Sequence, residues 1–205
     1  MSPRPDIRSA FSLIELLVVI AIITVLAALA LPAFNSIQNA SGLTKTASDI
    51  AGMLEQARAY AMAQNTYVWI GFRKDGTDSL TVGVVASKTG SSNPSANIVQ
   101  LGKISRFENV QLVALPDFGA RPGTNVTQLS GASDPALSFT TGTNTFNSQV
   151  IRWNSRGEAR IAPSQISRLI EIGLQASAAG VIRNASNAAA LQIGGLSGAV
   201  IVYRP

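Results

Sequence analysis

An apolar run that carries one acid constrains this chain more than any other feature. Residues 11–32 read FSLIELLVVIAIITVLAALALP, and the acid is Glu15. A helix over residues 11–31 is about 30 Å long, which matches the hydrocarbon thickness of a bilayer. A carboxylate inside a bilayer costs on the order of 2.5–3.5 kcal/mol, so it usually has a partner or a function. The sequence therefore predicts a membrane-spanning helix whose acid needs an explanation.

Two ordinary explanations of the run account for its length but not for its acid. A secretory signal has an apolar core of roughly 7–15 residues followed by a small-residue cleavage site. Ala28, Leu29 and Ala30 imitate such a site, but the apolar stretch before them is too long for that core. A plain membrane anchor fits the length of the run and gives Glu15 no role.

The residues at the start of the run carry a third explanation. Residues 10–16 read AFSLIEL, they follow a short basic leader with Arg4 and Arg8, and a long apolar helix comes after them. This arrangement resembles the prepilin motif of type IV pilins and type II secretion pseudopilins. The resemblance implies that prepilin peptidase cuts between Ala10 and Phe11 and methylates the new amino terminus at Phe11. Glycine is more usual than alanine before the cut in that family.

The same resemblance gives roles to Glu15 and Pro32. In a filament of such subunits, the positive Phe11 amine lies near Glu15 of a neighbouring subunit, and two groups that are costly to bury singly are tolerated as a pair. Pro32 matches the proline that family members commonly have at the end of the membrane-embedded part, where it bends the helix. We therefore expect Glu15 to act in assembly and the helix to be kinked or interrupted near Pro32 and Gly42.

Beyond residue 32 the apolar residues recur at spacings of three and four, the period of one helical face. They are Phe34, Ile37, Ala40, Leu43, Ala47, Ile50, Leu54, Ala57 and Ala61. The period predicts that the helix continues to about residue 64 and that this face packs on the chain's own globular domain. A seam with a partner helix is the alternative, and both contacts are compatible at different depths of the helix.

After residue 65 the period changes from 3.6 to 2, which indicates β-strands. Residues 66–72 and 79–86 flank a turn signal at Asp75 and Gly76 and predict a hairpin. Two short strands are expected within residues 98–115 and a long loop over residues 117–135. Later strands are expected at residues 137–140, 150–153, 158–161, 168–173, 191–193 and 199–203, with turns at residues 154–157 and 194–198. Many short strands at this spacing predict a β-sheet or two-layer β domain.

A long amino-terminal helix that leads into an all-β domain is similar to the minor pseudopilins of the H group and to FimT-like minor pilins. Residues 151–160, IRWNSRGEAR, are similar to a strand, turn and glycine hairpin of that group. In the FimT relatives, an arginine-bearing carboxyl-terminal region binds DNA. The resemblance makes Arg152, Arg156, Arg160 and Arg204 candidate nucleic-acid contacts, whereas alternating arginines on a strand more often form a solvated face.

The composition excludes several classes of site. The chain has no histidine and no cysteine, which removes Ser-His-Asp and Cys-His nucleophiles, zinc sites built from these residues, and disulfides. The glycines of residues 194–198 lack the lysine and the strand-to-helix context of a phosphate loop. A net charge of +5 favours weak contacts with anionic surfaces or simply a soluble surface. We expect no enzymatic activity, no cofactor and no metal site.

These observations predict an α+β chain in which a long amino-terminal helix, membrane-spanning in its first half, packs on a carboxyl-terminal all-β domain. The expected parts are a cleaved leader at residues 1–10, a transmembrane and assembly helix at 11–34, its amphipathic continuation at 35–64, and a β-rich domain at 65–205.

The expected function is that of a structural pilin-like subunit, a minor pseudopilin or minor pilin, in a type II secretion or type IV pilus-type filament. The alternative is a membrane-anchored, DNA-binding minor pilin that acts in DNA uptake. The expected partners are other pilin subunits, prepilin peptidase and the inner membrane with its assembly platform. The β domain is expected on the periplasmic side.

Overall fold

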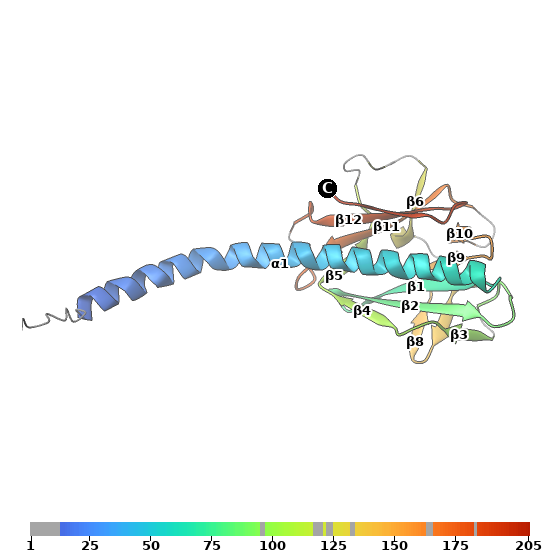
Figure 1. The fold of residues 1–205 in the computed structure, drawn as a ribbon, viewed down its shortest axis with the longest axis horizontal. Coiled ribbons are helices and arrows are strands. Elements are labelled where there is room, and N and C mark those ends of the chain that lie inside the picture. Colours follow the sequence, from blue (N-terminus) through green and yellow to red (C-terminus); the bar gives the residue numbers. More distant parts are fainter. Residues whose placement is uncertain are drawn as a thin grey trace, which may run out of the picture. The chain divides into compact units, whose positions relative to one another are not determined.

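The computed structural model describes residues 13–94, 97–116, 121, 125–131, 134–162, 166–182 and 184–205, and for residues 29–41 it describes the backbone alone. In this part of the chain one long helix is followed by three β-sheets (Figure 1). The chain divides into two compact units, Met1–Gln38 and Asn39–Pro205. The second unit holds all the described strands and the second half of the helix. The predicted α+β class is therefore confirmed.

The helix α1 spans Leu13–Ala63. The backbone stays helical through Pro32 and Gly42, so of the two expected alternatives, a kink or an interruption, the interruption does not occur. A proline removes one backbone donor from the helical ladder, and a helix of this length keeps the rest of its hydrogen bonds on both sides of that loss. A bend at Pro32 without an interruption stays a prediction.

Asn65 ends α1. Its φ angle is 48°, in the left-handed region that asparagine adopts more readily than most residues. The amide of Thr66 donates to the carbonyl of Ala61 at 3.0 Å, and the amide of Asn65 donates to the carbonyl of Met62 at 3.4 Å. This is the hydrogen-bond pattern of a Schellman motif, which satisfies the last carbonyls of the helix and turns the chain into the first strand.

The strands form two large sheets and one small hairpin. The first sheet has the order β10-β9-β1-β2-β3, with β4 also paired to β2. Its strands are β1 (Val68–Asp75), β2 (Ser79–Ser87), β3 (Ile98–Gln100), β4 (Ser105–Glu108), β9 (Gln149–Trp153) and β10 (Ala159–Arg160). The second sheet has the order β13-β12-β11-β5, with β6 also paired to β11, and this β6–β11 pair is parallel. Its strands are β5 (Val110–Val113), β6 (Val126–Gln128), β11 (Leu169–Ala176), β12 (Ala188–Gly194) and β13 (Val200–Tyr203).

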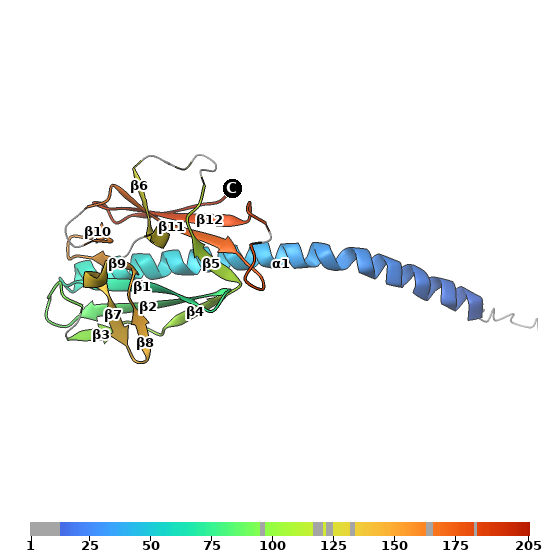
Figure 2. The ribbon, with the colours of Figure 1, turned by 180° about the vertical axis from the view of Figure 1, so that it is seen from behind.

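The second half of α1 and both large sheets share one hydrophobic core. The helix residues of the predicted stripe that can be checked are all buried, namely Leu43, Ala47, Ile50, Leu54, Ala57 and Ala61. They form one cluster with Ile70 and Leu80 of the first sheet and with Ile172 and Leu191 of the second. Figures 1 and 2 show this part of α1 running between β1 and β2 on one side and β11 and β12 on the other. The prediction that the stripe packs on the chain's own domain is confirmed for this half of the helix.

The outer face of the first sheet carries a second cluster, covered by a hairpin of β7 (Phe139–Thr141) and β8 (Asn144–Phe146). Phe146 packs there with Trp69 and Val85. Two short 3-10 helices, η1 (Leu129–Gly131) and η2 (Pro135–Leu137), precede the hairpin. The domain is thus a β-sandwich-like pair of sheets with the second half of α1 against their inner faces and the β7–β8 hairpin on the outer face of the first sheet.

The predicted strands are mostly present, and the differences have local causes. The hairpin of β1 and β2 forms as expected, but β1 continues to Asp75, which pairs with Ser79, so the turn begins at Gly76. Residues 98–115 hold three strands and not two. β4 joins the first sheet and β5 the second, because Asn109, with a φ of 58°, turns the chain from one sheet to the other. The strands β6 and β8 were not predicted.

Candidate functional site

The first part of α1 exposes a continuous apolar surface. Every described side chain over residues 13–28 is exposed. The large apolar ones are Leu13, Ile14, Leu16, Leu17, Val18, Val19, Ile20, Ile22, Ile23, Val25 and Leu26. Contiguous apolar surfaces of this size are rare on isolated soluble proteins and usually mark a site of interaction with another protein or a membrane. We call residues 13–28 the apolar stem.

Glu15 is the one ionisable residue of the apolar stem. It lies in the first turn of α1, where a carboxylate is favoured by the positive end of the helix dipole. Within the part of the chain that the structure describes, Glu15 has no hydrogen bond and no ion pair. Thr24, by contrast, donates its hydroxyl to the carbonyl of Ala21 at 2.8 Å and so satisfies itself inside the helix. The acid therefore has no partner among the described residues that explains its presence.

The sequence also made predictions about the cleavage site, Pro32 and a membrane-spanning helix in this segment, and the structure describes only part of the residues concerned. Ala10 and Phe11, the predicted cleavage and methylation residues, lie outside the described residues. Pro32 lies within α1, and its side chain is outside the described part. No helix in the described part of the chain combines the length and the apolar character that crossing a membrane requires.

Arg152, Arg156 and Arg160 lie together on the first sheet. Arg152 on β9 and Arg160 on β10 are direct register partners, so their side chains lie on the same face of the sheet. Arg156 lies in the turn between these strands, with Nε 3.1 Å from Oε1 of Glu158. Arg160 NH2 lies 3.4 Å from the other carboxylate oxygen of Glu158. The structure thus brings three of the four candidate arginines together, and their role as nucleic-acid contacts stays a prediction.

Arg204 lies elsewhere. It follows β13 and donates from NH1 to the carbonyl of Ala188 at 2.9 Å and from NH2 to Oδ1 of Asn187 at 3.3 Å, at the start of β12. The other arginines lie near the far end of β12, where Gly195 accepts a hydrogen bond from the amide of Ala159. The length of this strand separates the two places by about 20 Å. The four arginines predicted as nucleic-acid contacts do not form one surface.

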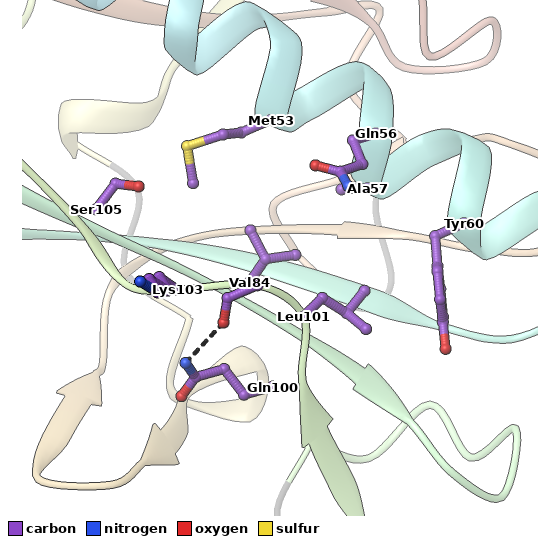
Figure 3. Close-up of a pocket in the computed structure, with 10 residues that line it drawn as sticks. Met53, Gln56, Ala57, Tyr60, Val84, Gln100, Leu101, Lys103 and Ser105 are labelled. Atoms are coloured by element: carbon purple, nitrogen blue, oxygen red, sulfur yellow. Dashed lines mark hydrogen bonds between the residues drawn. The ribbon is translucent and has the colours of Figure 1, made fainter.

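A groove that the sequence did not predict lies between α1 and the segment that joins β3 to β4. It has a volume of about 420 Å³ and is lined by residues that include Met53, Tyr60, Leu101 and Lys103 (Figure 3). Gly102, with a φ of 72°, lets the chain bulge away from β2 at this point. In the sequence, the signal for this bulge was Gly102, which lies between two short segments with a strand pattern.

No group of three or more acidic, histidine or cysteine side chains that could hold a metal ion occurs in the described ranges. The functional features that remain are the apolar stem with Glu15, the arginines of the first sheet, and the groove beside α1.

Comparison with known proteins bears on the apolar stem. Residues 7–31 match the family model described as the prokaryotic N-terminal methylation motif. This match supports a type IV pilin-like subunit that is processed by prepilin peptidase and assembles with other pilin subunits. Neither a curated protein sequence nor a solved structure matches the chain. Because the matched residues all precede the β domain, the match assigns the chain to no subgroup and to no particular secretion or pilus system.

Proposed function

We propose that this chain is a structural, non-enzymatic subunit of a type II secretion or type IV pilus-type filament, either a minor pseudopilin or a minor pilin. The observation that carries the proposal is the apolar stem, whose acid Glu15 has no partner within the described chain. The methylation motif over residues 7–31 supports the same function. The order of a long helix followed by a β-sandwich-like domain supports a subunit of the H or FimT-like kind.

In the proposed pathway the leader is removed between Ala10 and Phe11, and the Phe11 amine is methylated. The subunit is held by its apolar stem in the inner membrane, with the β domain on the periplasmic side, until the assembly platform inserts it into a filament. The helices of neighbouring subunits then replace lipid as the cover of the stem. The apolar surface of the stem thus stays out of water throughout the exchange. Keeping such surface out of water contributes about 25 cal/mol per Å².

Glu15 sets the register in this assembly. The charged Phe11 amine and the Glu15 carboxylate are each costly to bury alone and are tolerated when they pair. Phe11 and Glu15 are close to each other along the sequence. A pair between neighbouring subunits therefore fixes the axial position of one helix against the next, while the leucines and isoleucines of the stem supply area but little positional preference.

Two experiments test the proposal. Mass spectrometry of the mature protein should give a chain that starts at methylated Phe11, and a chain that starts at Met1 would remove the main support for processing. Glu15→Ala should abolish incorporation into filaments and leave membrane insertion intact. Asp49→Ala is the matched control, because Asp49 is an exposed acid of the same helix that pairs with Lys45 at 2.7 Å. Normal incorporation of the Glu15→Ala subunit would rule out the register mechanism.

A further inference from the structure

Arg152 is a recessed cation on the outer face of the first sheet. Its exposed fraction is 8%, and it makes no hydrogen bond and no ion pair with any described residue. A guanidinium has five N–H donors and no acceptor, and buried donors without acceptors cost free energy. None of its nitrogens is sealed from solvent. The methylene groups of Arg152 are therefore covered, while its guanidinium group still reaches the surface.

The neighbours of Arg152 hold it in place without neutralising it. Its Cζ atom lies 5.3 Å from the centre of the Tyr67 ring, a cation–π distance. Arg160 is its direct register partner on β10, and like charges directly opposite each other in a sheet repel. Burial, and then the nearby Arg160, lower the pKa of Arg152, while Tyr67 and Asp134 oppose this change. The backbone register thus keeps two guanidinium groups beside each other.

The charges around this pair favour a small anion over a polymer of phosphates. Three arginines, Arg152, Arg156 and Arg160, meet two carboxylates, Glu158 and Asp134. One net positive charge therefore remains in this group. A single carboxylate of a ligand is enough to neutralise it. A nucleic-acid backbone needs a run of cations that continues past the first contact, and here the cations are interrupted by acids.

We propose that Arg152, Arg160 and Tyr67 form a socket for a single carboxylate side chain of a protein partner. The planar fork of an arginine matches the geometry of a carboxylate and binds it through two parallel N–H···O bonds. Arg152 supplies this fork at the bottom of the socket, and Arg160 supplies the second cation from β10. The ring of Tyr67 lies against the Arg152 guanidinium, with Cζ 5.3 Å from the ring centre. The socket does not depend on the apolar stem, so it operates whether or not the chain assembles into filaments.

The test is a nuclear magnetic resonance titration of the full chain in a non-ionic detergent. Acetate, a blocked Gly-Glu-Gly peptide and inorganic phosphate are added separately at constant ionic strength, and the Nε–Hε signals of the arginines are followed. We expect saturable shifts at Arg152 and Arg160 with acetate and with the peptide. Arg160→Gln should weaken this binding about tenfold or more, because a hydrogen bond to a charged group is lost.

Arg204→Gln is the matched control, because Arg204 is also a partly buried arginine and its removal changes the net charge by the same amount. This variant should bind acetate as the unmodified chain does. Arg152→Lys keeps the charge but loses the fork, and it should bind more weakly while the fold stays intact. Equal weakening by Arg204→Gln would show a general charge effect and overturn the socket.

Three other results would also overturn the proposal. The first is the absence of any saturable shift at Arg152. The second is tighter binding of phosphate than of acetate. The third is binding of duplex DNA at low salt that is lost in Arg152→Lys and Arg160→Gln but kept in Arg204→Gln, which would make the pair a nucleic-acid contact.

Discussion

The guanidinium of Arg121 lies 2.8 Å from the carboxylate of Glu171, measured from Nε to Oε2, and the two side chains have exposed fractions of 2% and 0%. Glu171 stands on β11 and also accepts hydrogen bonds from Gln128 of β6 at 2.6 Å and Gln192 of β12 at 2.7 Å. Arg121 donates further to the carbonyl of Pro116 at 2.9 Å. One carboxylate on β11 therefore joins β6, β12 and the side chain of Arg121.

Removal of one partner of this ion pair should be strongly destabilising. Arg121→Met leaves a buried carboxylate without its counter-charge, and we expect it to lower the free energy of unfolding by about 3–5 kcal/mol. The double variant Arg121→Met with Glu171→Gln should recover much of this loss, because no charge then remains to be buried. Urea denaturation measures both changes. A loss below about 1 kcal/mol in the single variant would contradict this account.

A second prediction concerns the ring of Phe146, which lies across two glycines of the first sheet. Gly71 and Gly83 are direct register partners on β1 and β2. A Cβ atom at Gly71 would lie 2.6 Å from Cβ and Cγ of Phe146, and one at Gly83 would lie 2.7 Å from Cζ. Gly71→Ala and Gly83→Ala should each lower the free energy of unfolding by about 1–3 kcal/mol, as overpacked cores do.

The two glycine variants should differ in their rescue. Phe146→Leu removes Cζ and keeps Cβ and Cγ, so it should relieve the clash in Gly83→Ala and leave the clash in Gly71→Ala. Thermal unfolding of the two double variants, each compared with its single variants, measures the difference. Equal rescue of both would mean that the β7–β8 hairpin moves away from the sheet as a unit.

The features that could be predicted from the sequence are those set by neighbours along the chain. The spacing of Ile50 and Leu54 predicted a buried helical face, because residues three and four apart lie on one side of a helix. Asp75 and Gly76 predicted the β1–β2 hairpin through the backbone freedom that its turn requires. The apolar stem and Glu15 can be recognised in the sequence itself, without any knowledge of the fold.

The features that could not be predicted depend on which strands become neighbours. β4 and β5 are consecutive, yet they pair with β2 and β11 in different sheets. In the sequence, Glu171 is a charged residue between apolar ones, the pattern of an exposed position on a strand. In the structure it is buried, because Arg121 and Gln128 cover it from distant parts of the chain. The partner of Arg152 is Tyr67, which precedes the first strand. Sequence spacing holds no information on such contacts.

The third prediction concerns pH and Glu158. Asn154 donates from Nδ2 to Oε2 of Glu158 at 2.7 Å, and Arg156 and Arg160 lie beside the same carboxylate. The hydrogen bond from Asn154, followed by the contacts with Arg156, holds the pKa of Glu158 below its usual value and outweighs the opposite effect of burial. A carboxyl with a lowered folded-state pKa stabilises the fold above its unfolded pKa of about 4.3 and loses this contribution as the pH falls through the folded value.

Glu158→Gln should therefore cost stability at pH 6 and cost less at pH 3. Urea denaturation of both chains at the two pH values gives the difference in unfolding free energy at each. The side chain of the glutamine keeps the size of the glutamate, so the pH-dependent part of the difference reports the charge. An equal difference at pH 6 and pH 3 would mean that the carboxylate contributes through shape or neutral hydrogen bonds and not through its ionisation.

The last prediction is a stabilising change at Ala179. Ala178 and Val181 exchange two backbone hydrogen bonds, of 3.0 and 3.1 Å, and the residues between them, Ala179 and Gly180, have φ angles of 52° and 78°. This is a two-residue turn with both central residues in the left-handed region, where an alanine is disfavoured by about 1–2 kcal/mol and a glycine is not. The greater flexibility of glycine in the unfolded chain offsets part of this gain. Ala179→Gly should thus raise the melting temperature by about 1–4 °C. Ala178→Gly, at a position without a positive φ angle, is the control and should lower the melting temperature. A lower melting temperature in Ala179→Gly would show that the left-handed conformation at this residue carries no strain.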